Sequence, residues 1–334
     1  MQEKEIWIAC GGTGGHFMPG VVVGKSLMKR GIKVVFWGEG KVIEENLMEA
    51  QGVDMQRPAP GSRWQRLKQM RKMMNQMAKT NKPDACLCFG GFSSLALGTW
   101  AIFKGVPYHL FEQNAFPGRV NRFLAPLSKT CHLTFPLEGA KLLFSKCFHT
   151  GNPVRKIGVN PELKERDLLI LGGSQGAKSL NCELPKLIKG TLNVLHICGP
   201  GRLKECEEAW KGSVFGGEIK ILESHANIPE LLATSKWTIS RAGATSICEM
   251  VGAKVGCITV PYPFAKDDHQ RANARYLASK KGTYIFEEEA FETKSEWLND
   301  LLLDDVACQT CFEGLEQAGL DDSEGLKAIE VILA

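Results

Sequence analysis

Short apolar runs alternate along the chain with longer segments that have helical periodicity. Each run holds four to six residues, the length of a strand buried in a parallel sheet. The pattern predicts strands at residues 6–9, 32–37, 85–89, 108–111, 131–135, 147–150, 167–171, 194–198, 219–222, 237–240, 257–260 and 283–286. Strands that alternate with helices in this way imply an α/β protein with mainly parallel sheets covered on both faces.

The strand, glycine-rich turn and helix that open the chain recur about half a chain later. Residues 6–16 show this pattern first, and residues 167–177 repeat it after a polar run at 160–166 that we interpret as a linker. A length of 334 residues also favours about two domains. We therefore predict two doubly wound, Rossmann-like domains, residues 1–156 and 157–321, that face each other across a cleft. A helix at 322–334 is expected to rejoin the first domain.

The composition is that of a soluble globular protein. Hydrophobic residues make up 44% of the chain and charged residues 23%, and the net charge of +4 is too small to favour nucleic acid as a partner. The polar start of the chain has no secretory pattern, and no apolar run reaches the ~18 residues of a membrane span. The 12 cysteines lack the spacing of a disulfide framework, which indicates a reducing cytosol. A lone C-x-x-C at 308–311 does not indicate a metal site.

The first glycine-rich turn, at residues 10–16, leaves the backbone open to close approach by a ligand. It does not match the dinucleotide fingerprint, because Phe17 stands where the last glycine is required. Glu39, at the end of the second strand, keeps a dinucleotide-dependent oxidoreductase open as an alternative. His16 closes the turn, and an unperturbed histidine titrates near neutral pH. We take His16 as the candidate general base, with a structural histidine as the alternative.

The chain from 240 to 270 reads as strand end, turn, helix, strand and loop. Gly243 precedes a predicted helix start that carries Thr245 and Ser246, and a helix N-terminus favours an anion such as phosphate. Glu249 lies three residues after Ser246 and four after Thr245, so all three side chains share one helical face. A carboxylate there can accept both hydrogen bonds of a ribose diol. The alternative is that Glu249 is an ordinary acidic residue of the helix and that Thr245 only caps its N-terminus.

Polar groups also follow other predicted strands. A second glycine and serine turn stands at 90–94, Glu112 and Asn114 come after the strand at 108–111, and Asn121 follows in the next segment. Open α/β sheets bind ligands at the carboxyl ends of their strands. The same residues can instead cap helices or make turns, and the sequence leaves both interpretations open.

The segment at 63–82 is predicted to form a basic amphipathic helix. Trp64, Leu67 and four methionines recur at spacings of three and four, and seven Lys and Arg residues fill other positions without one acidic residue. Such a helix fits an anionic membrane surface. The alternative is that the apolar stripe packs into the core and leaves a solvated basic face.

Six motifs together resemble GT-B glycosyltransferases, and most closely the lipid-linked N-acetylglucosaminyltransferases of peptidoglycan synthesis, in glycosyltransferase family 28. They occur in the family's order at residues 11–16, 112–121, 151–155, 172–177, 240–249 and 267–273. The resemblance implies an inverting transfer of N-acetylglucosamine from UDP-N-acetylglucosamine to the C4 hydroxyl of the muramoyl-peptide of undecaprenyl-pyrophosphate-linked lipid I, which gives lipid II. A UDP-N-acetylglucosamine epimerase of related fold and a non-catalytic lipid or nucleotide-sugar binding protein are the alternatives.

The resemblance also implies roles for individual residues. Glu249 would hold the ribose, Ser174 a phosphate, and Arg155 would lie near the uracil. Further donor contacts are implied for Gly12, Thr13, Gly14, Gly15, Asn114, Ala244, Thr245, Ser246, His269 and Gln270. The acceptor would enter beside the base His16, with Glu112 and Asn121 on its side. Trp64, Arg66, Leu67 and Arg71 would face the membrane.

The resemblance implies no required cofactor or metal, because UDP-N-acetylglucosamine is itself a substrate. The expected partners are UDP-N-acetylglucosamine, undecaprenyl-linked lipid I, an anionic inner-membrane surface and possible wall-synthesis proteins, with no nucleic acid. The protein is expected on the cytoplasmic face of the cell membrane, bound peripherally. Three features depart from the family: the segment at 224–228 replaces a more apolar stretch near the uracil, Ser246 stands where a threonine is usual, and the cysteines have no counterpart.

Overall fold

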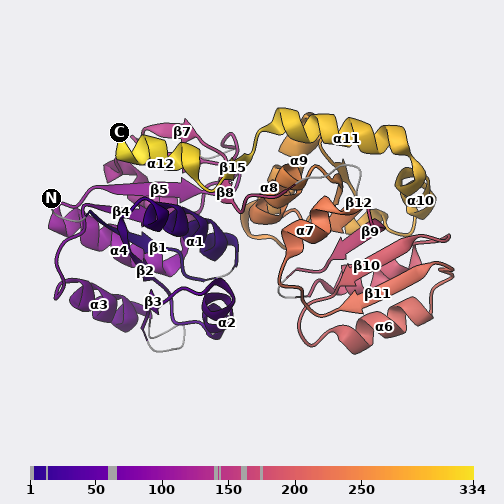
Figure 1. The fold of residues 1–334 in the computed structure, drawn as a ribbon, viewed down its shortest axis with the longest axis horizontal. Coiled ribbons are helices and arrows are strands. Elements are labelled where there is room, and N and C mark those ends of the chain that lie inside the picture. Colours follow the sequence, from indigo (N-terminus) through magenta and orange to yellow (C-terminus); the bar gives the residue numbers. More distant parts are fainter. Residues whose placement is uncertain are drawn as a thin grey trace. The chain divides into compact units, whose positions relative to one another are not determined.

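The chain divides into two compact units (Figure 1). The computed structural model describes residues 4–12, 14–58, 66–138, 142, 144–158, 164–173 and 176–334. Unit 1 comprises Met1–Arg155 and Leu320–Ala334, and unit 2 comprises Lys156–Gly319. Each unit holds one large parallel sheet covered by helices, which confirms the predicted fold class. None of the helices in the described ranges has the length and apolar character needed to span a bilayer.

The sheet of unit 1 has seven parallel strands in the order β3-β2-β1-β4-β5-β6-β7. The strands are β1 (Glu5–Ala9), β2 (Lys33–Trp37), β3 (Met55–Gln56), β4 (Ala85–Cys88), β5 (Tyr108–Glu112), β6 (Thr130–Leu133) and β7 (Cys147–His149). The helices are α1 (Gly14–Lys29), α2 (Val42–Gln51), α3 (Arg66–Met77), α4 (Gly91–Lys104), α5 (Arg119–Leu124), the 3-10 helix η2 (Ala125–Leu127) and the C-terminal α12 (Leu326–Leu333). A separate parallel pair, β8 (Asn152–Val154) and β15 (Asp321–Ser323), brings the C-terminal segment into this unit.

The sheet of unit 2 has six parallel strands in the order β11-β10-β9-β12-β13-β14. They are β9 (Arg166–Leu171), β10 (Asn193–Ile197), β11 (Glu218–Leu222), β12 (Ser235–Ser240), β13 (Gly256–Thr259) and β14 (Tyr284–Ile285). The α-helices are α6 (Leu203–Lys211), α7 (Ile228–Ala233), α8 (Ala244–Ala253), α9 (His269–Ser279), α10 (Ser295–Leu303) and α11 (Asp305–Ala318). Short helical turns are η3 (Ser179–Glu183), η4 (Leu184–Lys186), η5 (Lys266–Asp268) and η6 (Glu288–Ala290).

Both sheets reverse their strand order at one point. In unit 1, β1 lies between β2 and β4, and in unit 2, β9 lies between β10 and β12. A doubly wound sheet opens a crevice outside the carboxyl ends of the strands at such a switch point. The turns after β1 and β4, and those after β9 and β12, are therefore where the topology favours ligand binding in each unit.

Alternation of side chains along β1 explains how the helices of unit 1 are held. Ile6 and Ile8 pack with α1 and α12 on one face of the sheet, and Trp7 and Ala9 pack with α3 and α4 on the other. Successive side chains of a strand point to opposite faces, so a strand buried on both sides must be apolar throughout. Each buried aliphatic side chain contributes about 1.5–3 kcal/mol, and the sheet of unit 1 is thereby a rigid support for its turns.

The methionine stripe of the basic helix packs into the core. Met73 and Met77, on α3, are 1% and 0% exposed and belong to the cluster that contains Trp7. Lys68 and Arg71, like other basic residues of the segment, are exposed on the opposite side. The core-packing alternative therefore holds for the methionines. Trp64 lies outside the residues that the structure describes. Arg66 and Leu67 are the first residues of α3, but their side chains are not among those described.

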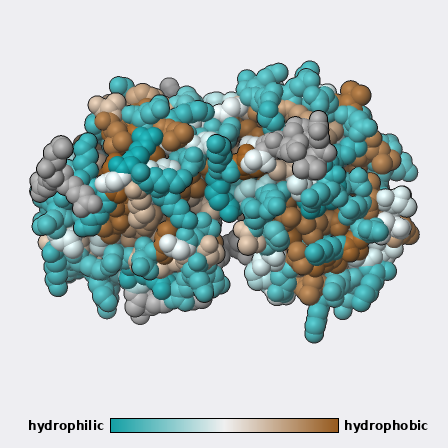
Figure 2. All heavy atoms as spheres, in the orientation of Figure 1, coloured by the Kyte–Doolittle hydropathy of each residue, from teal (hydrophilic) through white to brown (hydrophobic). Residues whose placement is uncertain are grey.

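The surface agrees with the composition. Hydrophilic side chains cover most of the visible face of each unit, and hydrophobic residues gather there in smaller areas (Figure 2). The exposed face of α3 contributes only polar and charged side chains to this surface among its described positions.

Candidate functional site

A buried carboxylate holds the first glycine-rich turn of unit 1. Glu44, in the first turn of α2, is 0% exposed, and its carboxylate accepts hydrogen bonds from the backbone N–H groups of Gly12 (2.7 Å), Glu39 (3.0 Å) and Gly40 (2.9 Å). One side chain thus joins the turns after β1 and β2. The pairing also takes the N–H of Gly12 out of the set of groups that could hold a phosphate.

Glu39 caps a helix. Its carboxylate accepts from the backbone N–H of Phe92 at 2.5 Å, near the start of α4, and pairs with Lys41 Nζ at 2.7 Å. Its side chain is only 7% exposed. A negative group at a helix N-terminus satisfies otherwise unpaired N–H groups and the helix dipole. Since these partners already engage the carboxylate, the ribose contact of the dinucleotide alternative is disfavoured.

His16 lies against the second glycine turn. It belongs to the first turn of α1, and a β-carbon at Gly90 would come within 2.9 Å of His16 Nε2. Gly90 has a φ of +101°, so a side chain there would be both strained and obstructed. The Ser94 hydroxyl accepts from the N–H of Gly90 (2.9 Å) and donates to the carbonyl of Ala9 (3.1 Å). These contacts place the imidazole at the switch point of unit 1.

Glu112 and Asn121 lie beneath the loop that follows β5. The Glu112 carboxylate is 3% exposed and accepts from the N–H groups of Asn114 (3.1 Å) and Gly118 (2.8 Å) and from Asn121 Nδ2 (2.8 Å). Burial raises the pKa of Glu112, and the hydrogen bonds from the loop oppose that rise. Asn121 Nδ2 also donates to the carbonyl of Phe111 at 2.9 Å. The two residues shape the loop that presents Asn114.

A relay of buried polar groups fixes the glycine turn of unit 2. Trp210 Nε1 donates to His196 Nδ1 (3.1 Å), so neutral His196 carries its proton on Nε2, which donates to Asn181 Oδ1 (3.1 Å). Asn181 Nδ2 in turn donates to the carbonyl of Cys198 (2.8 Å). Burial lowers the pKa of His196 to about 3, which keeps it neutral.

Close packing above that relay explains two of the glycines. A β-carbon at Gly172 would lie 2.9 Å from Asn181 Oδ1, and one at Gly199 would lie 2.9 Å from the Cα atom of Gly176. Gly199 also has a φ of +93°. Backbone without side chains can therefore sit directly on the relay. Ser174, the predicted phosphate contact, lies outside the described residues, as does Thr13.

The start of α8 has no side-chain cap. Its N-cap residue is Gly243, which has no side chain to offer, and Asn273 Nδ2 holds the preceding turn by donating to the carbonyl of Ala242 at 3.2 Å. Thr245, Ser246 and Glu249 are half-buried and share one face of the helix. The positive end of the helix dipole favours an anion, and a carboxylate lies one turn behind it.

Arg241 connects the loops that surround the start of α8. Its guanidinium donates to Ser179 Oγ at 2.9 Å and to the carbonyl of Val260 at 3.2 Å, and pairs with Glu288 at 2.5 Å. It also lies over the ring of Tyr262, 5.2 Å from the centroid. Sequence reasoning did not select Arg241. Its position directly after a strand end was the available signal, but its partners are distant in the chain.

Gln270 and His269 begin α9 after a tightly turned loop. Gln270 Oε1 accepts from the N–H of Tyr262 at 3.0 Å, which leaves the Nε2 amide as the group it can present to a ligand. His269 Nδ1 donates to the carbonyl of Lys266 at 2.7 Å. Asp267 and Asp268 adopt φ values of +55° and +50°, so the loop closes through left-handed backbone.

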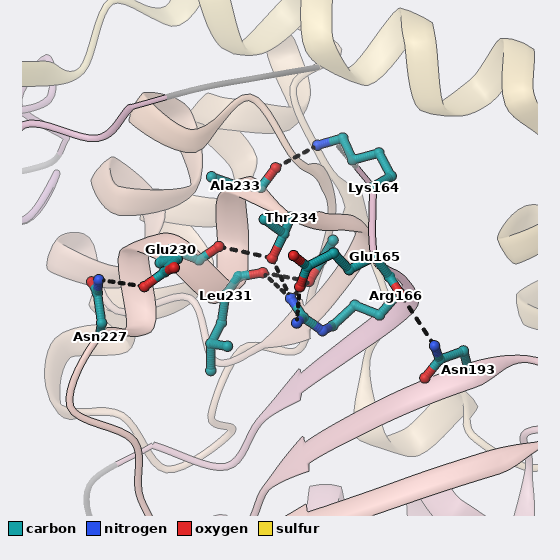
Figure 3. A network of polar contacts seen from close by, with 10 residues as sticks. Lys164, Glu165, Arg166, Asn193, Asn227, Glu230, Leu231, Ala233 and Thr234 are labelled. Atoms are coloured by element: carbon teal, nitrogen blue, oxygen red, sulfur yellow. Dashed lines mark hydrogen bonds and ion pairs between the residues drawn. The ribbon is translucent and has the colours of Figure 1, made fainter. Parts of the chain in front are cut away.

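Helix α7 orients the segment after β11 (Figure 3). Arg166 donates to the carbonyl of Leu231 (3.0 Å) and Lys164 to that of Ala233 (3.1 Å), which satisfies the carboxyl end of the helix. At the other end, Asn227 Nδ2 donates to Glu230 at 2.7 Å. Both ends of α7 are therefore held, and the segment at 224–228 that departs from the family leads into a fixed helix.

The predicted residues that the structure describes lie in both units. In unit 1, Gly12, Gly14, Gly15 and His16 follow β1, Glu112, Asn114 and Asn121 lie at and after the end of β5, and Arg155 follows β8. Unit 2 gathers Ala244, Thr245, Ser246, Glu249, His269 and Gln270 after β12 and β13. Among the residues the structure describes, no cluster of three or more His, Cys, Asp or Glu side chains could bind a metal ion.

Comparison with known proteins agrees with both units. Residues 6–132 match the glycosyltransferase family 28 N-terminal domain, and residues 167–310 match its C-terminal domain. The UDP-N-acetylglucosamine–N-acetylmuramyl-(pentapeptide) pyrophosphoryl-undecaprenol N-acetylglucosamine transferase of Hahella chejuensis is 31% identical, over 90% of each chain. The crystal structure of Acinetobacter baumannii MurG is similar with a TM-score of 0.76 and 26% identity, over 99% of each chain.

The epimerase alternative finds support at the level of the fold alone. A crystal structure from Listeria monocytogenes titled "putative UDP-N-acetylglucosamine 2-epimerase" has a TM-score of 0.69, but its identity is 12%, over 99% of this chain and 95% of that one. The relatives that share about 30% of their residues are transferases. This chain belongs to glycosyltransferase family 28, and within it to the UDP-N-acetylglucosamine–N-acetylmuramyl-(pentapeptide) pyrophosphoryl-undecaprenol N-acetylglucosamine transferases.

Proposed function

We propose that this chain transfers N-acetylglucosamine from UDP-N-acetylglucosamine to the C4 hydroxyl of the muramoyl-peptide of lipid I, giving lipid II. Membership of the family supports the reaction. The structural observation that carries it is the start of α8, where an uncapped helix N-terminus, two hydroxyls and a carboxylate share one face. This set matches a nucleotide diphosphate followed by a ribose.

The donor binds to unit 2 in this proposal. The N–H groups at the start of α8, with Thr245 and Ser246, hold the diphosphate, and Glu249 accepts hydrogen bonds from the ribose diol. Gln270 presents its Nε2 amide to the sugar, and Arg241 keeps the surrounding loops in register. Ser174 as a further phosphate contact, Arg155 near the uracil and donor contacts by Thr13, Gly14, Gly15, Asn114 and His269 stay predictions. The donor contact predicted for Gly12 is not part of this proposal, because Glu44 accepts from its N–H.

Unit 1 supplies the base. The acceptor hydroxyl attacks the anomeric carbon as the bond to UDP breaks, and His16 takes the hydroxyl proton. General-base help of this kind is typically worth roughly 100- to 10,000-fold. The charge that develops on the leaving diphosphate is stabilised by the helix N-terminus that holds it. Glu112 and Asn121 contribute by shaping the loop with Asn114, and no cofactor enters the reaction.

The acceptor's lipid tail requires a membrane, and the basic face of α3 is our proposal for the docking surface. Lys68, Arg71 and Lys72 on α3 are exposed, as is Lys79 just after the helix. Because Met73 and Met77 are committed to the core, this contact would be electrostatic and would weaken with salt. We place the protein peripherally on the cytoplasmic face of the membrane, where wall-synthesis proteins are possible partners.

Incubation with radiolabelled UDP-N-acetylglucosamine, with and without lipid I, tests the function. Label that moves into the lipid fraction only when lipid I is present supports the transferase. An epimerised nucleotide sugar formed without lipid I would favour the epimerase, and binding without turnover in either mixture would favour the non-catalytic alternative.

A further inference from the structure

Two cysteines occupy paired positions on neighbouring strands at the edge of unit 1. Strand β6 pairs with β7 in parallel, and the register sets Cys131 opposite Cys147. Strand β7 is the last of the sheet and has only three residues. Directly paired residues of adjacent strands point to the same face of a sheet.

The next residue pair along the two strands confirms the direction in which these side chains point. The next pair in the register is His132 opposite Phe148, and their rings are stacked with centroids 6.2 Å apart on the opposite face. Cys131 and Cys147 must therefore share the remaining face, where Cys131 packs in the core cluster with Leu133. The Cys147 thiol itself donates to the carbonyl of Ser145 at 3.6 Å.

The two thiols differ in access and in acidity. Cys147 is exposed, whereas Cys131 is 0% exposed. The neighbouring Cys131 thiol lowers the pKa of Cys147 to about 7, against the opposing effect of burial, while the pKa of Cys131 is raised well above its ordinary value. One member of the pair is thus a reachable thiolate near neutral pH, and its neighbour is a protonated thiol.

We propose that Cys147 and Cys131 form a redox-modification site, in which Cys147 reacts with a peroxide and Cys131 resolves the product to an intrachain disulfide. The Cys147 thiolate attacks one oxygen of hydrogen peroxide, giving a sulfenic acid and hydroxide. The Cys131 sulfur then attacks the sulfenic sulfur and loses its proton, and the S–OH oxygen leaves as water. The cysteines are oxidised by two electrons in total and the peroxide is reduced, and a dithiol reductant reverses the bridge.

The location gives the bridge a consequence for the fold. After β7 the chain runs through Thr150 and Gly151, whose N–H groups both donate to the carbonyl of Leu133 at 3.2 Å, into β8 and then Arg155, the last residue before unit 2. A disulfide would lock this edge strand to β6 just before the chain leaves unit 1.

Peptide mapping after peroxide treatment tests the site. The full-length protein is treated with hydrogen peroxide, free thiols are blocked, and the non-reduced digest is analysed by mass spectrometry. We expect the Cys131 and Cys147 peptides linked to each other, with the loss of two hydrogens, and separate again after dithiothreitol. Cys147 left as an unresolved sulfenic acid in the wild type, or linked to a different cysteine, would overturn the proposal.

Two variants and one internal control assign the roles. In Cys147→Ser, Cys131 should stay reduced, and in Cys131→Ala, Cys147 should stop at a sulfenic acid that dimedone traps. Cys182, half-buried with a raised pKa, is the control thiol, and iodoacetamide should modify Cys147 at least about tenfold faster at pH 7. Equal rates at the two positions, or oxidation of Cys131 in Cys147→Ser, would contradict the assignment.

Discussion

The glycine turns of the two units have the same place in the topology but different occupants. In unit 1, the N–H of Gly12 and the start of α4 are already paired with the carboxylates of Glu44 and Glu39. In unit 2, α8 starts at Gly243 without a side-chain cap. In unit 1 the protein's own carboxylates thus take N–H groups that could otherwise hold an anion. This difference supports our proposal that the diphosphate binds to unit 2 and that unit 1 supplies the base.

Removing the base should have the largest effect. In His16→Ala, we expect kcat to fall by roughly 100- to 10,000-fold because the acceptor hydroxyl loses its general base. The affinity for UDP-N-acetylglucosamine should stay that of the wild type, since unit 2 holds the donor. Steady-state kinetics with lipid I and a separate donor-binding titration measure the two quantities, and near-normal turnover would remove His16 from the chemistry.

Acid should destabilise unit 1 more than unit 2. Burial lowers the pKa of His109 to about 4 and of His132 to about 3 in unit 1, and that of His196 to about 3 in unit 2. A histidine held neutral when folded gains a proton on unfolding, so its stabilisation is full above the ordinary pKa of 6.5 and is lost as the pH falls towards the folded value. From pH 7 to pH 5 each contributes a loss of roughly 2 kcal/mol.

Hydrogen exchange measured at both pH values, unit by unit, checks this difference. Protection of the core strands should fall about twice as much, in free energy, for unit 1 as for unit 2. The raised pKa values of Glu112 and Asp322 act in the opposite direction within unit 1. His132→Asn should therefore be compared with the wild type, and an unchanged pH response in that variant would refute the histidine explanation.

Loss of the ribose contact should weaken donor binding. Glu249→Ala removes hydrogen bonds to a charged acceptor, worth about 1.5–3 kcal/mol, so the Kd for UDP-N-acetylglucosamine should rise roughly 10- to 150-fold. Isothermal titration provides the measurement. Glu208→Ala, at an exposed carboxylate on α6, serves as the matched control and should bind as the wild type does. A donor affinity that survives Glu249→Ala would take this residue off the ribose.

The corresponding change in unit 1 should affect stability and leave donor binding intact. Glu44→Gln turns one end of a buried acceptor into a donor that faces backbone N–H groups, at a cost of about 1–3 kcal/mol in the free energy of unfolding. Urea denaturation followed by fluorescence measures the loss. If the variant instead bound UDP-N-acetylglucosamine tenfold more weakly at unchanged stability, the contrast between the two turns would fail.

The sequence predicts the strands and the local clusters well, because both depend on neighbours in the chain. The apolar run at 85–89 becomes β4, and Thr245, Ser246 and Glu249 share a face because helical spacing requires it. The pattern at 63–82 predicts a helix that continues to residue 82, whereas α3 ends at Met77. The spacing of apolar residues shows which face of a helix is buried but does not fix where the helix ends. The short strands β8 and β15 were not predicted, since they pair across about half of the chain.

The supporting residues of the candidate site escape sequence reasoning for the same reason. Glu44 lies 32 residues from Gly12, and Arg241 lies 62 residues from Ser179. Periodicity cannot reveal such pairs. Glu39 illustrates the opposite case: its position after a strand suggested a ribose contact, but a backbone N–H from α4, 53 residues away, occupies its carboxylate.

Hydrogen exchange with and without UDP-N-acetylglucosamine tests the assignment of the donor most directly. If unit 2 holds the diphosphate, the nucleotide sugar should slow exchange at the amides of Ala244, Thr245 and Ser246 and leave those of Gly11 and Gly12 unchanged. Slower exchange at Gly11 and Gly12, with no change at the start of α8, would contradict the account.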